Sequence, residues 1–145
     1  MLALSHHPVP LRETPPGFRL RIVASAGAGF PSPAQDYEDD ALSLVELLRI
    51  DRPAAFVFRI SGSSMIEAGI YDHDIVVVDR DAKARNGSIV IATVEGGFVC
   101  RQLCIRSGVG YLEARNSRMT YTLTICDETV EIFGVVRASV RDHQR

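Results

Sequence analysis

The sequence predicts a mainly β domain with one or two short helices, preceded by an extended N-terminal arm. Three observations support this. Short runs rich in valine, isoleucine and phenylalanine recur from residue 56 to residue 136, turns with glycine separate several of them, and only two segments have helical character. The chain has 145 residues, 46% of them hydrophobic, which suits one packed domain with an arm.

Residues 1–38 are predicted to form the arm. They contain six of the seven prolines and the small-residue run Ala24–Gly29, a composition that buries little apolar surface. Within them, Phe18–Val23 alternates apolar and basic residues and is expected to be a short edge strand, docked on the body or on a partner chain. The β domain is expected over residues 39–145, with Arg141–Arg145 as a solvated tail.

The first helix is expected directly after the arm. Asp39 and Asp40 precede the apolar segment Ala41–Leu48, so acidic residues stand at the positive end of the helix, and Pro53 follows shortly after it. A second, short helix is expected over Met65–Ile70, closed by a glycine.

Strand patterns dominate the rest of the chain. The segment Ile75–Val78 is apolar throughout and is therefore expected to be buried on both faces. Glu95–Gly97 predicts a hairpin turn between two strands. The expected strands are Phe56–Ile60, Ile75–Val78, Ser88–Val94, Phe98–Leu103, Tyr111–Ala114, Tyr121–Ile125 and Val130–Val136.

Charge and hydropathy argue against several classes of protein. A net charge of −2 gives no general electrostatic reason to bind DNA. No apolar run approaches the roughly 18 residues of a membrane span, and the N-terminus carries prolines and charges where a secretory signal needs an apolar core. We therefore expect a cytoplasmic protein with no membrane contact and no sequence-specific DNA binding of its own.

The three cysteines, Cys100, Cys104 and Cys126, fit that compartment. Their odd number and their spacing argue against a disulfide scaffold. Cys100 and Cys104 have no cysteine or histidine nearby in the sequence to complete a metal site. We expect all three to be small apolar side chains in strands, and we expect neither a metal nor another cofactor.

Ser64 is the candidate nucleophile. It lies in Ser61–Met65, a glycine-bearing turn that follows an expected strand and precedes the second expected helix. A hydroxyl at a helix N-terminus lies beside unpaired backbone N–H groups, which can stabilise the oxyanion of an acyl-transfer reaction. An alternative needs no chemistry, because Ser64 with Glu67 three residues later has the pattern of a capping box.

Two residues compete for the role of base. Asp72, His73 and Asp74 supply the residue types of a Ser-His-Asp triad, but they are adjacent to one another directly before a strand, which is typical of a polar turn. Lys83 lies in a polar loop between two expected strands. Neither His73 nor Lys83 is therefore expected to activate Ser64.

Five segments resemble the LexA/UmuD family of self-cleaving serine peptidases. Gly29–Tyr37 is similar to the segment after the cleavage point of UmuD-type proteins, and Ser61–Met65 resembles the nucleophile motif. Asp72–Asp79 matches an Asp-Gly-Asp turn and the strand after it, with a histidine in place of the glycine. The resemblance implies the twisted antiparallel sheets of the LexA/UmuD-type C-terminal peptidase domain. The five segments are Gly29–Tyr37, Ser61–Met65, Asp72–Asp79, Asn86–Ala92 and Ile132–Val136.

The resemblance implies that Ser64 acts with a lysine, in a Ser/Lys dyad. That lysine belongs on the strand after the glycine hairpin, in a pattern like Phe-x-Val-Lys-x-Leu. The segment Phe98–Leu103 has this pattern with Arg101 at the lysine's position. Arg101 therefore stands where the family has its general base.

Arginine cannot do what lysine does at this position. Burial can lower the pKa of a lysine until its neutral amine acts as a base, whereas a guanidinium stays protonated and only donates hydrogen bonds. Arg101 alternates in step with Val99, Leu103 and Ile105, so it is expected to point to the apolar side of its strand. Losing general-base assistance costs about 10²–10⁴-fold in rate. A snorkelling Arg101 with no role is the alternative.

The resemblance also implies a function, as an accessory subunit of an error-prone, lesion-bypassing DNA polymerase in the SOS response. It implies a homodimer whose partners are the RecA–single-stranded DNA filament, a UmuC-like polymerase and the replicative sliding clamp. RecA promotes cutting within the arm, here expected between Ala28 and Gly29. These small residues let an extended chain pass close to Ser64, although they also suit a plain hinge.

Three other functions fit parts of the sequence. A LexA-like repressor needs a DNA-binding module, and the 28 residues before Gly29 hold no pair of helical patterns for a helix-turn-helix. A signal-peptidase-like enzyme shares the Ser/Lys chemistry but needs a membrane anchor. A non-catalytic binding subunit, which keeps the fold and the partners without the chemistry, fits Arg101 and is the main alternative.

Overall fold

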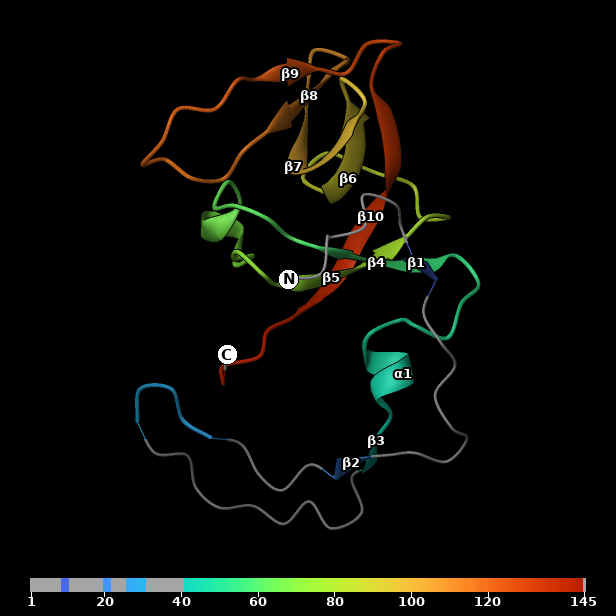
Figure 1. The fold of residues 1–145 in the computed structure, drawn as a ribbon, viewed down its shortest axis with the longest axis vertical. Helices are drawn as coiled ribbons and strands as arrows, with labels where there is room; N and C mark the ends of the chain where they lie inside the picture. Colours follow the sequence, from blue (N-terminus) through green and yellow to red (C-terminus); the bar gives the residue numbers. More distant parts are fainter. Residues whose placement is uncertain (1–8, 11–19, 22–25, 31–40, 145) are drawn as a thin grey trace.

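The structure is a computed structural model, which describes residues 9–10, 20–21, 26–30 and 41–144. These residues form a mainly β fold, as the sequence predicts (Figure 1). One antiparallel sheet has eight strands in the spatial order β1-β4-β5-β10-β6-β7-β8-β9, and a second, two-stranded sheet pairs β2 with β3.

The strands of the large sheet come from the whole length of the described chain. The small sheet joins β2 (Leu20–Arg21) to β3 (Ala41–Leu42). The large sheet contains β1 (Val9–Pro10), β4 (Ala55–Arg59), β5 (Ile75–Asp79), β6 (Ile89–Val94), β7 (Gly97–Arg106), β8 (Val109–Glu113), β9 (Thr124–Ile125) and β10 (Glu131–Val140).

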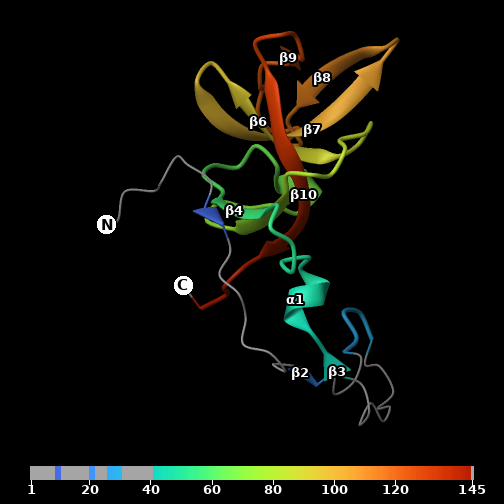
Figure 2. The same ribbon diagram turned by 90° about the vertical axis from the view of Figure 1, so that its right-hand side faces the viewer.

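The long strand β10 joins the two parts of the large sheet. It pairs with β5 along one edge and with β6 along the other, and Figure 2 shows it running from the β4 region up to β6 and β9. Register shifts between Val136 and Ala138, and between Ile132 and Gly134, interrupt its two ladders. Such bulges bend and twist a strand, so β10 can serve two differently oriented parts of the sheet.

The core has two clusters of buried side chains, and β6 contributes to both. Its Ile91 belongs to the first cluster, while Val90 and Ala92 belong to the second, so this strand is buried on both faces. The first cluster is Ile60, Met65, Ile70, Val76, Val78, Ile91, Cys100 and Phe133. The second is Val90, Ala92, Leu103, Leu112 and Val135.

Four phenylalanines connect the strands around the first cluster. The ring of Phe133 on β10 makes edge-to-face contacts with Phe56, Phe58 and Phe98, at centroid distances of 5.5, 5.3 and 5.9 Å. Each such pair contributes about 0.5–1.5 kcal/mol beyond its buried area. Because Phe98 lies near the start of β7, these contacts help to fix the strand that carries Arg101.

The predicted strands are confirmed, with differences at their ends. β7 and β10 run several residues beyond the predicted Phe98–Leu103 and Val130–Val136. Of the predicted strand Tyr121–Ile125, only Thr124–Ile125 pairs with a neighbour. The hairpin between β6 and β7 turns at Glu95 and Gly96, both with positive φ, as a two-residue turn requires.

The first helix is shorter than predicted. Helix α1 spans Leu44–Leu47, and Ser43 caps it by accepting a hydrogen bond from the Glu46 N–H at 3.4 Å. The prediction of a helix over Ala41–Leu48 is wrong at its start, because Ala41 and Leu42 pair with β2 instead. Asp39 and Asp40 lie outside the described residues. Across the ranges described above, no helix combines the length and apolar character needed to cross a membrane.

Most of the predicted arm, residues 1–38, lies outside the described residues. Two described parts of it pair with strands. β1 forms an edge of the large sheet, with Pro10 opposite Phe56, and an edge tolerates a proline because one side of the strand needs no partner. β2 lies within the predicted strand Phe18–Val23, whose other residues are not described.

The predicted solvated tail, Arg141–Arg145, is exposed over its described residues 141–144, but its first residue, Arg141, is held at the turn before β5. Its Nε and Nη2 donate to the two oxygens of Asp74, each at 2.8 Å, and Asp74 is only 1% exposed. The guanidinium also lies 4.0 Å from the ring centroid of Tyr71. The hydrogen bonds to Asp74 raise the pKa of Arg141. No residue near Arg141 in the sequence indicates that its partner is Asp74, far away along the chain.

Candidate active site

Ser64 lies in the turn between β4 and β5. Gly62 has a φ of +98°, a conformation that favours glycine, and its N–H donates to Asp72 Oδ1 at 2.8 Å. On the other side of the serine, Met65 is 1% exposed and belongs to the first core cluster. The backbone on both sides of the hydroxyl is therefore held in place.

The expected short helix after Ser64 is confirmed as the 3-10 helix η1 (Ile66–Ala68), which ends at Gly69 with a φ of +81°. Its N-cap is Met65, so Ser64 lies outside the helix. The N–H groups of η1 itself already have acceptors within the protein, so they are not unpaired donors for an oxyanion at Ser64. These acceptors are the carbonyl oxygens of Ser63, Arg115 and Met65.

The capping box between Ser64 and Glu67 is also wrong. Glu67 Oε2 accepts a hydrogen bond from Ser117 Oγ at 2.6 Å, and the Glu67 N–H donates to the carbonyl of Arg115. The bond from Ser117 is the main cause that lowers the pKa of Glu67. Glu67 therefore ties η1 to the loop after β8, and the Ser64 hydroxyl is left for another partner.

That partner is Arg101. It lies on β7 opposite Val90 of β6, and its Nη1 donates to Ser64 Oγ at 2.9 Å and to the carbonyl oxygen of Cys100 at 2.8 Å. The guanidinium carbon lies 5.7 Å from the ring centroid of Tyr121. The side chain is half-buried and turned toward the serine. The two residues predicted to form the dyad thus lie in direct contact.

The surroundings of Arg101 are less apolar than predicted. Val99 and Leu103 pack with the second core cluster, as expected, but Ile105 is 43% exposed. The guanidinium itself meets a hydroxyl, a carbonyl and an aromatic ring. Its alternation with apolar residues does not place it in an apolar pocket, because the hydroxyl of Ser64 and the carbonyl of Cys100 both lie within hydrogen-bond distance of it.

The loop after β8 holds the serine turn from the other side. The Arg115 N–H donates to the Ser64 carbonyl at 2.7 Å, and Asn116 Nδ2 donates to the Ser63 carbonyl at 2.9 Å. Asn116 is only 6% exposed, and its Oδ1 accepts from the Arg118 N–H. Asn116 is not among the residues predicted for the site, since a single asparagine in a loop carries no local signal that it supports a distant turn.

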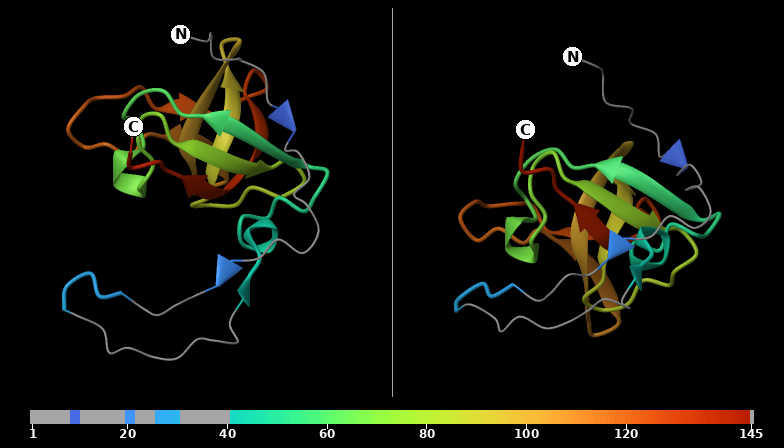
Figure 3. Two further views of the ribbon diagram at one scale, coloured as in Figure 1. Left: turned by 60° about the horizontal axis from the view of Figure 1, so that its bottom comes forward. Right: turned by 90° about the horizontal axis from the view of Figure 1, so that it is seen from below.

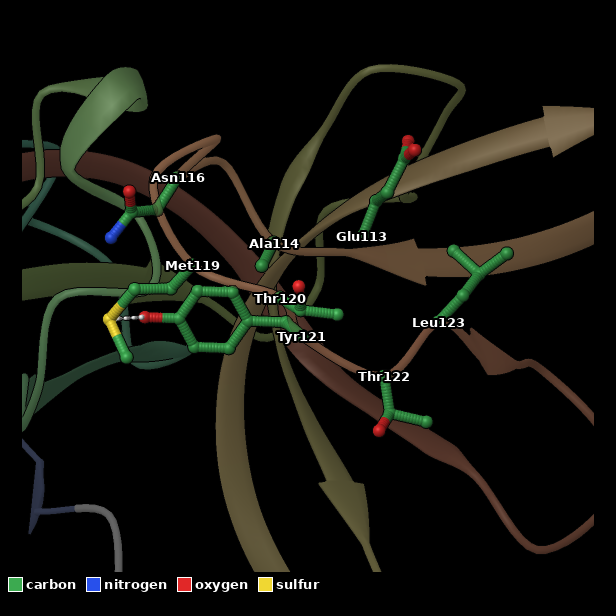
Figure 4. A pocket seen from close by; sticks show the side chains of 8 residues that line it. All are labelled: Glu113, Ala114, Asn116, Met119, Thr120, Tyr121, Thr122 and Leu123. Carbon is green, nitrogen blue, oxygen red and sulfur yellow. Dashed lines mark hydrogen bonds between the residues drawn. The ribbon is translucent and has the colours of Figure 1, made fainter.

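A pocket lies in the loop after β8 and reaches the pair of Ser64 and Arg101 through Tyr121. It has a volume of about 370 Å³ and is lined by residues between Glu113 and Leu123 (Figure 4). Tyr121, whose ring faces Arg101, lies at one end of the pocket with Met119, while Glu113 and Leu123 lie at the other. The Tyr121 hydroxyl lies 3.5 Å from Ser63 Oγ, which connects the pocket to the serine turn.

The other two candidate bases lie elsewhere. His73 has a left-handed φ of +72°, which explains why the family pattern has a glycine there, and its Nε2 lies 3.2 Å from Asp72 Oδ2. Its side chain is 62% exposed. Lys83 is exposed in the loop between β5 and β6. As predicted, Asp72–Asp74 form a polar turn.

The expected cleavage point is exposed and separate from Ser64. Residues 26–30 are all exposed, and a side chain added at Gly29 would have no neighbour within 4 Å. In Figure 1 and in the left panel of Figure 3 this segment lies apart from η1 and β7. The structure therefore brings Ser64 and Arg101 together, and does not bring Ala28 and Gly29 to them.

The cysteines are free thiols. Cys100 and Cys104 lie on β7 as predicted, but Cys126 directly follows β9 and is not in a strand. Cys100 is buried, and burial raises the pKa of its thiol to about 12. In the portion of the chain that is described, no three His, Cys, Asp or Glu side chains come together in a way that holds a metal.

Comparison with known proteins agrees with this geometry. The family described as Peptidase S24-like matches residues 21–137. Protein MucA of Escherichia coli is 40% identical over 116 residues, which cover 80% of each chain. Protein ImpA of Salmonella typhimurium is 43% identical over 113 residues, 75% of this chain and 74% of its own. Protein SamA of Salmonella typhimurium strain LT2 is 36% identical over 141 residues, 97% and 94% of the two chains. The resemblance to the LexA/UmuD peptidases is confirmed, and the chain belongs to the Peptidase S24-like family.

Proposed function

We propose that the protein is a UmuD-type accessory subunit of an error-prone, lesion-bypassing DNA polymerase of the polymerase V type, acting in the SOS response. We further propose that Arg101 impairs the self-cleavage that activates such subunits. Membership of the Peptidase S24-like family supports the first part. The hydrogen bond of 2.9 Å from Arg101 Nη1 to Ser64 Oγ carries the second.

The chemical reason lies in the direction of that hydrogen bond. Ser64 is the nucleophile of the proposal, and its attack on a peptide carbonyl requires the loss of the hydroxyl proton. Arg101 holds the position of the general base, but its guanidinium has no lone pair that accepts a proton. It can orient the hydroxyl and stabilise negative charge. Without a base the rate falls by about 10²–10⁴-fold.

Among the described residues, no other group is seen to accept the proton of the Ser64 hydroxyl. Within the described ranges, the Ser64 side chain has one hydrogen-bond partner, which is Arg101. His73 is held at Asp72, and Lys83 lies in an exposed loop. The proposal therefore rests on the chemistry of one residue.

The wider organisation follows the same family pattern. Residues 1–38 act as the arm that carries the bond between Ala28 and Gly29, and residues 39–145 form the peptidase-like domain. The proposed partners are a second copy of the chain, the RecA–single-stranded DNA filament, a UmuC-like polymerase and the replicative sliding clamp, all in the cytoplasm.

The same observation favours a second candidate function. If the protein never depends on cleavage, it is a non-catalytic binding subunit that keeps the fold and the partners. Arg101 in contact with Ser64 fits this function equally well, because a guanidinium that donates to the hydroxyl supplies no base. The two candidates differ in whether the uncut chain is the working form.

The direct test is an incubation of the purified protein with RecA, single-stranded DNA and a nucleoside triphosphate. We expect the chain to stay at full length over a time course followed by gel electrophoresis and mass spectrometry. An Arg101→Lys variant in a parallel reaction serves as the matched control for RecA activity. A fragment beginning at Gly29 from the unmodified chain would refute the proposal.

A further inference from the structure

Several arginines of the described chain form ion pairs with carboxylates, whereas Arg101 does not. Arg52, Arg106, Arg137 and Arg141 each lie within 4 Å of a carboxylate oxygen. Arg101 has no ion pair among the described residues, although its side chain is half-buried. A guanidinium carries five N–H donors, and only Nη1 is used here, on a hydroxyl and a carbonyl.

The Ser64 hydroxyl adds a further donor. Because Ser64 Oγ accepts from Arg101, the hydrogen of the Ser64 hydroxyl points to some other acceptor. The Tyr121 hydroxyl donates to Met119 Sδ at 3.6 Å, so the Ser63 hydroxyl, 3.5 Å away, is the donor toward Tyr121. The site therefore offers a cation and the O–H group of Ser64, which is the complement of a carboxylate.

The acidic residues nearby already have partners. Glu113, which lines the pocket, accepts from Arg106 Nη2 and from Cys104 Sγ. Figure 4 shows its carboxylate pointing away from Tyr121. Glu67 is held by Ser117, and the charges of Arg115 and Arg118 help to lower its pKa. Asp72, which accepts from the Gly62 N–H, lies beside His73. Arg101 is therefore a cation at Ser64 that has no carboxylate partner among the described residues.

The pocket extends the site beyond a single anion. Its volume of about 370 Å³ lies within the range of about 300–1,000 Å³ of sites for small ligands. Met119 and Leu123 contribute apolar side chains that are 58% and 43% exposed. An occupant with a carboxylate at Arg101 and a short, partly apolar chain in the pocket would satisfy both parts.

We propose that Arg101 and Ser64, with the adjoining pocket, form a binding site for a peptide carboxylate. This inference rests on the proposed function, because it takes the pair to be non-cleaving. Arg101 cannot act as a base, but its guanidinium can bind a carboxylate, which is the group that cleavage of a peptide bond produces. The source of the group is either the C-terminus of a peptide or an acidic side chain within one.

The test uses a synthetic peptide with the sequence of residues 22–28, acetylated at its N-terminus, and the full-length protein. Binding is measured by calorimetry for the peptide with a free C-terminal carboxylate and for its C-terminal amide. We expect the free acid to bind about ten- to a hundredfold more tightly, which is the usual effect of a hydrogen-bonded charge. An amidated peptide with glutamate as its last residue separates a side-chain carboxylate from a terminal one. Equal affinity for all three peptides would overturn the proposal.

Variants locate the effect. Arg101→Met should remove the preference for the free acid, and Ser64→Ala should reduce it in part. Arg85→Met is the matched control, because Arg85 is exposed in the loop between β5 and β6. A preference that survives Arg101→Met in a folded variant would place the carboxylate elsewhere and sink the proposal. The comparison of acid and amide on the unmodified chain stands even if a variant misfolds.

The outcome is separable from that of the proposed function. A fragment beginning at Gly29 in the RecA reaction refutes the loss of cleavage, whatever the peptides do. A full-length chain that binds acid and amide equally leaves the loss of cleavage in place and refutes only the carboxylate site.

Discussion

Arg101, and the lysine that the family resemblance implies at its position, carry the same charge on different chemical groups. The ammonium of a lysine can lose its proton when its surroundings disfavour charge, whereas the guanidinium keeps its proton and spreads the charge over a plane. The contact between Arg101 Nη1 and Ser64 Oγ has the length of a good hydrogen bond. Under the proposed function, this contact supplies the geometry that a dyad needs, and the ability to accept a proton is missing.

Arg101→Lys should restore self-cleavage in the presence of RecA filaments. We expect the rate to rise by about 10²–10⁴-fold, because the variant regains a general base. The rate should also increase with pH, since the amine acts as a base only in its neutral form, until the pKa of that lysine is passed. Single-turnover time courses at several pH values measure this.

Two controls accompany that variant. The double change Arg101→Lys with Ser64→Ala should be inert, and Arg85→Lys should not cleave. An inert Arg101→Lys single variant would mean that Ser64 is not the nucleophile or that residue 101 is not the position of the base.

Cys100 should be the least reactive of the three thiols in the folded protein. Burial raises the pKa of its thiol to about 12, so at pH 8 almost none of it is the reactive thiolate. Alkylation with iodoacetamide, read by mass spectrometry, should modify Cys100 only after the protein is unfolded in urea. Rapid modification of Cys100 in the native protein would contradict its burial on β7.

Much of the site could be predicted at this scale, and some of it could not. Ser64 and Arg101 could be predicted from the sequence because each lies in a short pattern of neighbouring residues. Asn116 was not, because its role depends on the Ser63 carbonyl, which only the fold brings near. Arg141 was missed for the same reason, since its partner Asp74 lies in the turn before β5.

Strand β10 contains a glycine that the packing requires. A Cβ built on Gly134 would lie 2.7 Å from the carbonyl oxygen of Asp79 and 2.7 Å from Val78 Cγ1. Both atoms belong to β5, so the close approach of β10 to β5 depends on the absence of a side chain. The bulge at this point of the β6 ladder allows that approach.

Gly134→Ala should destabilise the protein. We expect a loss of about 1–3 kcal/mol in the free energy of unfolding, the usual cost of forcing extra atoms into a packed core. Urea denaturation followed by circular dichroism measures it. Gly97→Ala is the matched control, because its added Cβ would meet its nearest neighbour at 3.9 Å, an ordinary contact. Equal stability of the two variants would contradict the tight packing at β10.

The strands were more predictable than the helices and the chain ends. Runs such as Ile75–Val78 predict buried strands because every position is apolar. Ala41 and Leu42 were placed in a helix because their spacing fits one, but pairing with Leu20 and Arg21 overrides that preference. The pairing of Val9–Pro10 with β4 has no sequence signal, since two residues are too few to form a pattern.

At the scale of the whole molecule, the proposed function divides the chain at the bond between Ala28 and Gly29. A chain that begins at Gly29 loses β1, which contributes two residues at an edge of the large sheet, and β2, whose two residues pair with β3. We expect its free energy of unfolding to fall by no more than about 1–2 kcal/mol, because only a few edge hydrogen bonds are lost. Thermal denaturation of the two chains measures this.

The same truncated chain separates the two candidate functions. In a primer-extension assay across a DNA lesion with a UmuC-like polymerase, we expect the chain from Gly29 to support bypass and the full-length chain not to. Equal support from the uncut chain would favour the non-catalytic binding subunit instead.

The course of β10 through the sheet has a consequence for how the molecule comes apart. Its Phe133 belongs to one core cluster and its Val135 to the other, only two residues away. Neither core cluster can lose its packing while the other holds β10 in place. We therefore expect the two parts of the large sheet that β10 joins to unfold as one cooperative unit. The amide hydrogens along this stretch should be among the last to exchange with solvent, at rates set by global unfolding alone.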